Sequence, residues 1–171
     1  MNSIHGESDQ HRDIIVVDNF VDTYQNLILK TVSLLYWSNK YCRHIGWIIK
    51  MDDDIILNAF KLRGRLPTDP SDKFLIFGKV NKGVTPKRGG RWPVTPEQFN
   101  KTVYPDYVTG GCYGLTSNAI NVILEKLEAW KKPLFWIEDV FTTGILRAGN
   151  LFWDSMRDFA KKSPPTPSFF D

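Results

Sequence analysis

Three consecutive aspartates, Asp52, Asp53 and Asp54, directly follow an apolar run at residues 46–51 (GWIIKM). Like charges this close repel one another, and desolvation beside an apolar strand adds to the cost. A divalent cation would compensate, and carboxylate oxygens are hard ligands that suit Mn²⁺ or Mg²⁺. Because side chains alternate along an extended chain, we expect Asp52 and Asp54 on one side as metal ligands. The alternative is a solvated acidic turn before the next helix.

A second acidic pair, Glu138 and Asp139, follows the apolar aromatic run at residues 134–137 (LFWI). The pair stands where a helix over residues 140–147 is expected to begin, and the positive end of a helix stabilises a nearby carboxylate. One of the two could act as the general base that takes a proton from an attacking hydroxyl. Ordinary charge at a helix start is the alternative interpretation.

Glycines and aromatic residues between the two acidic segments could form a ligand surface. Gly110, Gly111 and Gly114 bracket Cys112 and Tyr113, and glycine lets the backbone approach a ligand closely. Aromatic residues make up 13% of the chain. Their rings either stack on sugars or fill the core, so neither feature is specific by itself.

Hydrophobic periodicity predicts the elements that must position these side chains. Strand, helix and strand follow one another, which favours an α/β sheet with helices on its faces. A turn is expected at residues 67–72, a Gly, Pro and Lys-rich loop at residues 81–96, and a mixture of turn formers and aromatics at residues 104–116. Strands are expected at residues 13–17, 46–51 and 74–80, and helices at 22–38, 55–66, 118–130 (with Ser117 as N-cap) and 140–147.

Length, charge and cysteine content narrow the class of protein. The 171 residues fit one domain, with a net charge of +3 that gives no indication of nucleic-acid binding. No apolar run is long enough to span a membrane. The three histidines lie in the first quarter and belong to no nucleophile motif, and the cysteines lack zinc-site spacing. Cys42 and Cys112 are either one disulfide or two buried thiols.

An ordered series of motifs resembles the β-1,3-galactosyltransferase family, which includes β-1,3-N-acetylglucosaminyltransferases and relatives of Fringe. The match runs through most of the chain, so it is more specific than any single motif. Its members are Glu7, residues 13–15 (DII), 20–27 (FVDTYQNL), 29–31 (LKT), Trp37, Cys42, 50–54 (KMDDD) with Asn58, 92–94 (WPV), 104–107 (YPDY) with Gly110 and Tyr113, and 138–141 (EDVF) with Thr143 and Gly144.

The resemblance implies a GT-A-like, Rossmann-type mixed α/β sheet flanked by helices and incomplete on its N-terminal side. Residues 1–160 would form a single, partial catalytic domain, and residues 161–171 a proline-rich tail with little regular structure. It further implies an inverting, Mn²⁺-dependent (or Mg²⁺-dependent) hexosyltransferase that moves galactose or N-acetylglucosamine from a UDP-sugar to a glycan hydroxyl in β-1,3 linkage.

The resemblance also assigns roles to individual residues. Asp139 would be the base with Glu138 beside it, and Asp52 and Asp54 would hold the metal. Lys50, Asp52 and Asp53 would lie at the donor. The expected sugar-facing residues are Trp92, Tyr107, Gly110, Gly111 and Tyr113.

Two departures from the family pattern affect these expectations. Family members carry a membrane anchor, a stem and the first strands of the nucleotide-binding half before the stretch matched here, and we expect this chain to begin after those segments. By resemblance, the expected location of the catalytic domain is the lumenal side of the Golgi membrane. Some relatives also supply a metal-binding histidine after the EDV motif, whereas the last histidine here is His44. The competing hypotheses are a catalytically inactive glycan-binding or nucleotide-sugar-binding relative and a metal-dependent phosphoryl-transfer enzyme.

Overall fold

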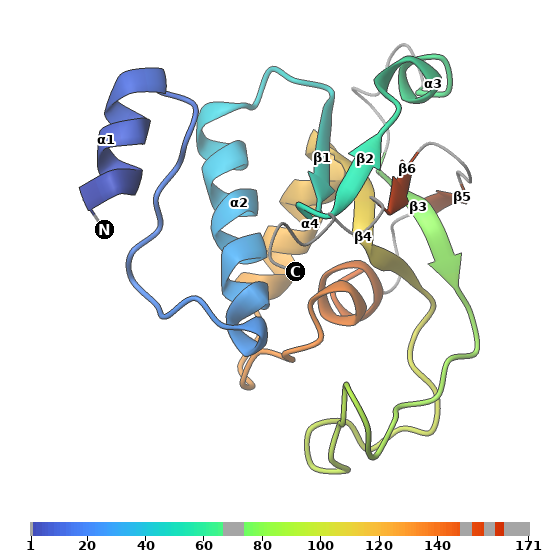
Figure 1. Ribbon diagram of the computed structural model, residues 1–171. Coiled ribbons are helices and arrows are strands. Elements are labelled where there is room, and N and C mark those ends of the chain that lie inside the picture. The colour runs from blue at the N-terminus through green and yellow to red at the C-terminus, as the bar shows by residue number, and fades with distance from the viewer. Residues whose placement is uncertain (1, 67–73, 148–151, 156–159, 163–171) are drawn as a thin grey trace, which may run out of the picture.

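The computed structural model describes residues 2–66, 74–147, 152–155 and 160–162. A mixed sheet lies at its centre (Figure 1). Strand β4 pairs antiparallel with β1 on one side and with β3 on the other, and β5 adds parallel to β3. The strands are β1 (Trp47–Met51), β3 (Leu75–Asn81), β4 (Tyr107–Thr116) and β5 (Phe152–Ser155).

Helices and a small second sheet complete the architecture. The two longest helices, α2 and α4, contact each other beside the sheet (Figure 1). A two-stranded antiparallel sheet joins β2 (Ile55–Leu57) to β6 (Ala160–Lys162). The helical elements are α1 (Asn2–His11), the 3₁₀ turn η1 (Tyr24–Asn26), α2 (Leu27–Tyr41), α3 (Ala59–Arg63), α4 (Ser117–Glu128) and the π-helical turn η2 (Val140–Ile145).

Apolar side chains pack on both faces of the sheet, as the two-residue period of a strand requires. On one face, Tyr113 and Leu115 of β4 pack with Ile76 and with buried residues of α2 and α4. On the other face, Phe77 packs with Leu62 and the partly buried Trp47. The central sheet is therefore covered on both sides, which is typical of an α/β fold.

Much of the predicted secondary structure is confirmed. Strands β1 and β3 lie where strands were expected at residues 46–51 and 74–80. Elements η1 and α2 cover residues 24–41 where a helix was expected at 22–38, and α4 covers residues 117–128 where one was expected at 118–130. The N-cap of α4 is Thr116, whose hydroxyl accepts from the Ala119 N–H at 3.2 Å. The prediction of Ser117 as the cap is wrong because that hydroxyl donates to the Ile45 carbonyl instead.

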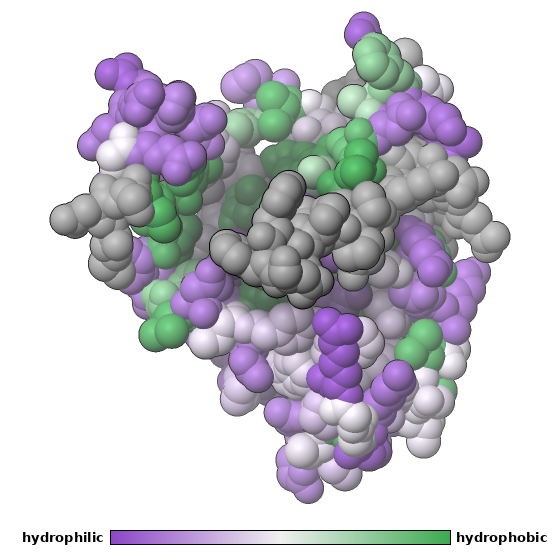
Figure 2. All heavy atoms as spheres, viewed as in Figure 1, coloured by the Kyte–Doolittle hydropathy of each residue, from purple (hydrophilic) through white to green (hydrophobic). Residues whose placement is uncertain are grey.

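The predicted strand at residues 13–17 is wrong. These residues have no regular secondary structure and pair with no strand in the described part of the chain. Ile15, Val16 and Val17 are 49%, 40% and 39% exposed, and Figure 2 shows hydrophobic surface between α1 and α2, where this segment runs. β-Branched residues favour a strand, but a strand needs a neighbour to which its backbone can hydrogen-bond.

Residues 55–66 and 104–116 also differ from expectation. Residues 55–57 form strand β2 rather than helix, so the helix is only α3. Residues 107–116, expected to contain turns, form the ten-residue central strand β4. A Cβ at Gly114 would lie 2.0 Å from the ring of Phe77, so this glycine makes room for an aromatic ring across the strand pair.

Two further predictions concern the ends of described segments. Lys161 and Lys162, expected in an irregular tail, lie in β6. Residues 163–171 of that tail and the turn expected at 67–72 lie outside the described residues. Cys42 and Cys112 are both free thiols and half-buried, so the disulfide alternative is excluded for this structure.

Candidate active site

The middle of β4 brings the two acidic segments together. The Asp52 N–H donates to the Gly111 carbonyl at 2.9 Å. One residue away, the Gly110 N–H donates to Asp139 Oδ2 at 2.9 Å. Asp52 and Asp139, which are far apart in sequence, are therefore hydrogen-bonded to two adjacent glycines. This junction lies at the carboxyl end of β1, where ligands gather in α/β sheets.

Lys50 is the cation at this junction. Its Nζ lies 2.5 Å from Asp52 Oδ1 and 2.7 Å from the Gly110 carbonyl oxygen. The same ammonium is 3.7 Å from Glu138 Oε2. Because the Lys50 side chain is only 10% exposed, its charge acts on both carboxylates with little screening by solvent.

Glu138 is buried and held by three side chains. It accepts a hydrogen bond from the Tyr113 hydroxyl at 2.6 Å, and the Thr31 hydroxyl of α2 also donates to it. Burial raises the pKa of Glu138, while Lys50 and the two hydroxyls oppose that rise. The residue is 4% exposed, so it ties α2, β4 and Lys50 together rather than facing an acceptor.

Asp139 is the more accessible acid of the pair. It caps η2, since its Oδ1 accepts from the Val140 N–H at 2.8 Å while Oδ2 accepts from Gly110. Burial raises the pKa of this half-buried carboxyl, and its two N–H donors and Lys50 lower it by less. A carboxylate with a raised pKa is a stronger proton acceptor, which is the property that a general base needs.

The triple aspartate forms a turn. The Ile55 N–H donates to the Asp52 carbonyl at 3.2 Å, which closes the turn through the exposed Asp53 and Asp54. The argument that Asp52 and Asp54 share one side of an extended chain is therefore wrong, because this backbone is not extended. Their role as metal ligands remains a prediction.

The chemistry of the donor set suits a hard divalent cation. Asp52 and Asp54 offer only carboxylate oxygens, the ligands that Mn²⁺ and Mg²⁺ prefer, and both carboxylates are accessible. Within the described ranges, no three His, Cys, Asp or Glu side chains lie close enough together to hold a metal ion. These residues fit a metal that takes further oxygen ligands from a phosphate or from water.

The expected sugar-facing residues fall into different environments. Tyr113 is fully buried and donates to Glu138, so its prediction as a sugar contact is wrong. Burial, followed by the charge of Asp139, raises the pKa of the half-buried Tyr107 to about 12, which places this ring near the acidic pair. Gly110 and Gly111 lie at the junction itself, and Trp92 lies in the loop after β3, where it donates to the Tyr24 hydroxyl.

A separate cavity of about 300 Å³ lies at the other end of β1. Its walls are the end of α2 and the start of α4, with Arg43, Ile48 and Asn118 among the lining residues. The acidic residues of the junction do not line it. The candidate chemistry is therefore separate from this cavity.

Sequence reasoning missed Thr31 as part of the site. The signal was present, because Thr31 is a buried polar residue on the apolar face of α2, and a buried hydroxyl normally has a partner. Its partner, Glu138, could be found only from the tertiary structure. Lys50 was expected at the donor, whereas its observed partners are two carboxylates and a carbonyl.

Comparison with known proteins gives the class of this domain. Over 163 residues the chain is 32% identical to human beta-1,3-galactosyltransferase 4, covering 77% of this chain and 43% of that protein. It is 30% identical to human lactosylceramide 1,3-N-acetyl-beta-D-glucosaminyltransferase, covering 78% of this chain and 36% of the relative. A hydroxyproline O-galactosyltransferase of Arabidopsis thaliana is 34% identical, covering 78% of this chain and 20% of the relative. The mixed α/β fold and these relatives define a glycosyltransferase domain.

The chain belongs to the galactosyltransferase family, whose profile matches residues 1–150. The resemblance read from the sequence motifs is thereby confirmed. The chain spans less than half the length of the curated relatives it matches. In the described residues, no helix combines the length and the apolar character needed to cross a bilayer.

Proposed function

We propose that this chain is the catalytic part of an inverting hexosyltransferase that moves galactose or N-acetylglucosamine from a UDP-sugar to a glycan hydroxyl in β-1,3 linkage. The observation that carries the proposal is the Asp139 carboxylate, fixed by the Gly110 N–H at 2.9 Å and joined through β4 to the aspartate turn. Family membership supports the same reaction class.

Asp139 acts as the general base. Its carboxylate takes the proton of the acceptor hydroxyl, and the hydroxyl oxygen forms a bond to the anomeric carbon of the donor sugar. The bond between that carbon and the diphosphate oxygen breaks, and UDP leaves with the electron pair. Fixing the carboxylate by two backbone N–H groups limits its motion, and such positioning is a large part of enzymatic rate enhancement.

The aspartate turn faces the donor. Asp52 and Asp54 would hold Mn²⁺ or Mg²⁺, and when bound the ion would neutralise charge on the departing diphosphate. Asp53 lies beside them as a further donor-side residue. Lys50 balances the charge of Asp52 and Glu138 from the protein side, and Glu138 holds Lys50 and Tyr113 in place.

We infer the class of acceptor and the location of the protein from those of the family. The names of two relatives include hydroxyproline and lactosylceramide, so acceptor chemistry varies within the family. We assign a glycan on a glycoprotein or glycolipid as acceptor here. The Golgi lumen, with attachment to the membrane through an N-terminal anchor, is the location we propose.

A panel of UDP-sugars tests the proposal. The purified chain should transfer one sugar to oligosaccharide acceptors in the presence of Mn²⁺, and a chelator should abolish transfer. Asp54→Ala and Asp139→Asn should each lower transfer by at least about a hundredfold, while Asp18→Ala, at an exposed aspartate outside the junction, should leave it unchanged.

Other outcomes of this assay would contradict the proposal. Metal-dependent binding of UDP-sugars without transfer would identify an inactive binding relative. Release of phosphate from phosphate esters without sugar transfer would identify a phosphoryl-transfer enzyme.

A further inference from the structure

Three aromatic side chains from distant segments meet at the surface. The Trp92 Nε1–H of the loop after β3 donates to the Tyr24 hydroxyl of η1 at 2.8 Å. The Tyr24 ring lies 6.2 Å from the Trp136 ring, edge to face with an interplanar angle of 67°. We call Tyr24, Trp92 and Trp136 the aromatic triad.

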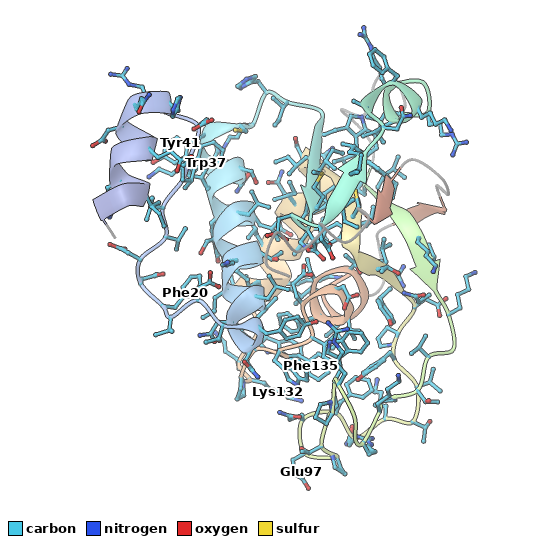
Figure 3. All side chains as sticks on the ribbon, in the orientation of Figure 1. Phe20, Trp37, Tyr41, Glu97, Lys132 and Phe135 are labelled. Atoms are coloured by element: carbon cyan, nitrogen blue, oxygen red, sulfur yellow. The ribbon has the colours of Figure 1, made fainter. Side chains whose placement is uncertain are left out.

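Two members of the aromatic triad are exposed, and the third packs against the edge of the core. Tyr24 is 55% exposed and Trp92 is 37% exposed, while Trp136 is half-buried. Phe135, which precedes Trp136 in the sequence, is instead buried against Phe99 and Tyr104. Figure 3 shows Phe135 between η2 and the loop after β3. Phe135 is therefore a core residue, while Trp136 packs against the core and keeps part of its side chain accessible.

Two cations hold the exposed end of the triad. The Arg91 guanidinium lies 4.9 Å from the centre of the Trp92 ring, and the Lys87 ammonium lies 6.0 Å from it. Cations at this distance from an indole face are attracted to it and restrict its motion. Both residues are exposed, so hydrogen-bond donors surround an apolar ring, the combination that carbohydrate hydroxyls and C–H faces require.

Two members of the triad come from the two segments of the chain that also meet at the acidic pair. The segment of η1 and α2 contacts the segment before η2 at two points. Tyr24 contacts Trp136, and Thr31 hydrogen-bonds to Glu138. Tyr24 and Thr31 are separated by about two helical turns, which corresponds to roughly 10 Å along η1 and α2. A sugar chain that runs from Asp139 along α2 toward η1 would extend over the triad.

We propose that Tyr24, Trp92 and Trp136 form a stacking platform for the acceptor glycan. The proposal rests on the transferase function given above and adds the acceptor side of the site to it. Exposed aromatic rings gain by covering the apolar face of a sugar, and Tyr and Trp keep a polar group available at the edge.

The test measures glycan binding and transfer separately. Saturation-transfer NMR with the full chain and oligosaccharides ending in β-linked galactose or N-acetylglucosamine detects acceptor binding without donor. Tyr24→Ala should weaken binding and raise the acceptor KM about tenfold, as expected for loss of a central aromatic contact. The KM for UDP-sugar and the kcat at saturating acceptor should remain near those of the unchanged chain.

Tyr41 provides a matched control. It is 56% exposed, lies at the end of helix α2, which follows η1 in the chain, and its ring centre is 5.5 Å from that of Trp37. Tyr41→Ala should leave glycan binding unchanged. Tyr24→Phe, which keeps the ring and loses only the bond to Trp92, should lie between Tyr24→Ala and the unchanged chain, and it retains the fold if the alanine variant does not.

The outcomes separate this proposal from the proposed function. Glycan binding that depends on Tyr24, without any transfer, would support the platform and contradict the transferase. Transfer with an acceptor KM that is equal in Tyr24→Ala and Tyr41→Ala would overturn the platform alone. Absence of saturation transfer from the unchanged chain to every oligosaccharide would overturn it as well.

Discussion

Gly110 lies against Asp139 so closely that a side chain at position 110 would reach the acidic pair. Its N–H donates to Asp139 Oδ2 at 2.9 Å. A Cβ placed on Gly110 would be 3.2 Å from the Cβ of Asp139 and 3.3 Å from Glu138 Oε2. The glycine therefore sets how near β4 comes to the base, which leads to the first prediction.

Gly110→Ala should lower kcat by about tenfold to a hundredfold, because displacement of a reacting group by a fraction of an ångström to one ångström has effects of that size. Steady-state kinetics measure the change. Gly111→Ala is the control, since a Cβ there would meet Ile55 Cδ1 at an ordinary 3.5 Å. Equal losses in the two variants would show that the effect is general to β4 and not specific to the contact with Asp139.

The rate of transfer should increase with pH through the pKa of Asp139. The ionised carboxylate is the active form of a base, and burial raises the pKa of Asp139 above its ordinary value of 3.8. The midpoint of the acidic limb of the kcat/KM profile should therefore lie above pH 3.8. Asp139→Asn should remove the limb and lower activity by about 10²- to 10⁴-fold. An unchanged acidic limb in that variant would assign the limb to another group.

Lys50→Gln should affect both stability and the pH profile. Removing the ammonium 3.7 Å from the buried Glu138 Oε2 leaves a carboxylate without its cation, at a cost of about 1–3 kcal/mol in the free energy of unfolding. Because the Lys50 charge lowers the pKa of Asp139, its loss should move the acidic limb to higher pH. Urea denaturation and the pH profile measure the two effects.

The control for Lys50 is the exposed pair of Lys30 with Asp22. These atoms are 2.8 Å apart, but the two side chains are 48% and 74% exposed, and solvent-exposed ion pairs contribute little. Lys30→Gln should therefore cost far less stability than Lys50→Gln. Equal costs would mean that the buried position of Lys50 does not matter.

Loss of the hydroxyl should have different effects on stability at Tyr113 and at Tyr104. Tyr113→Phe removes the 2.6 Å bond to Glu138 and should destabilise the fold by about 1–3 kcal/mol. The buried Tyr104 hydroxyl has no hydrogen-bond partner among the described residues. Tyr104→Phe should therefore leave thermal stability unchanged or increase it, because no bond is lost and an unsatisfied polar atom is removed. A large loss of stability in Tyr104→Phe would reveal a partner for that hydroxyl.

Local sequence patterns predicted those strands and helices whose own side chains form a clear apolar pattern. The apolar run before Asp52 predicted β1, and the 3.6-residue period predicted α2 and α4. The strand β4 was missed because its glycines lower strand propensity. It forms because it pairs on both sides and because the Phe77 ring fills the space at Gly114, and neither fact is local to its sequence.

The sequence by itself determined the family and the two acidic segments, because an ordered series of motifs and the residue types at Asp52–Asp54 and Glu138–Asp139 can be read along the chain. Only the tertiary structure decided how the two segments differ. Pairing with β4 places Asp139 on Gly110, turns Asp53 and Asp54 toward solvent and buries Glu138 and Tyr113 together. Accessibility and pKa depend on contacts between distant segments, and those contacts exist only after the strands have paired.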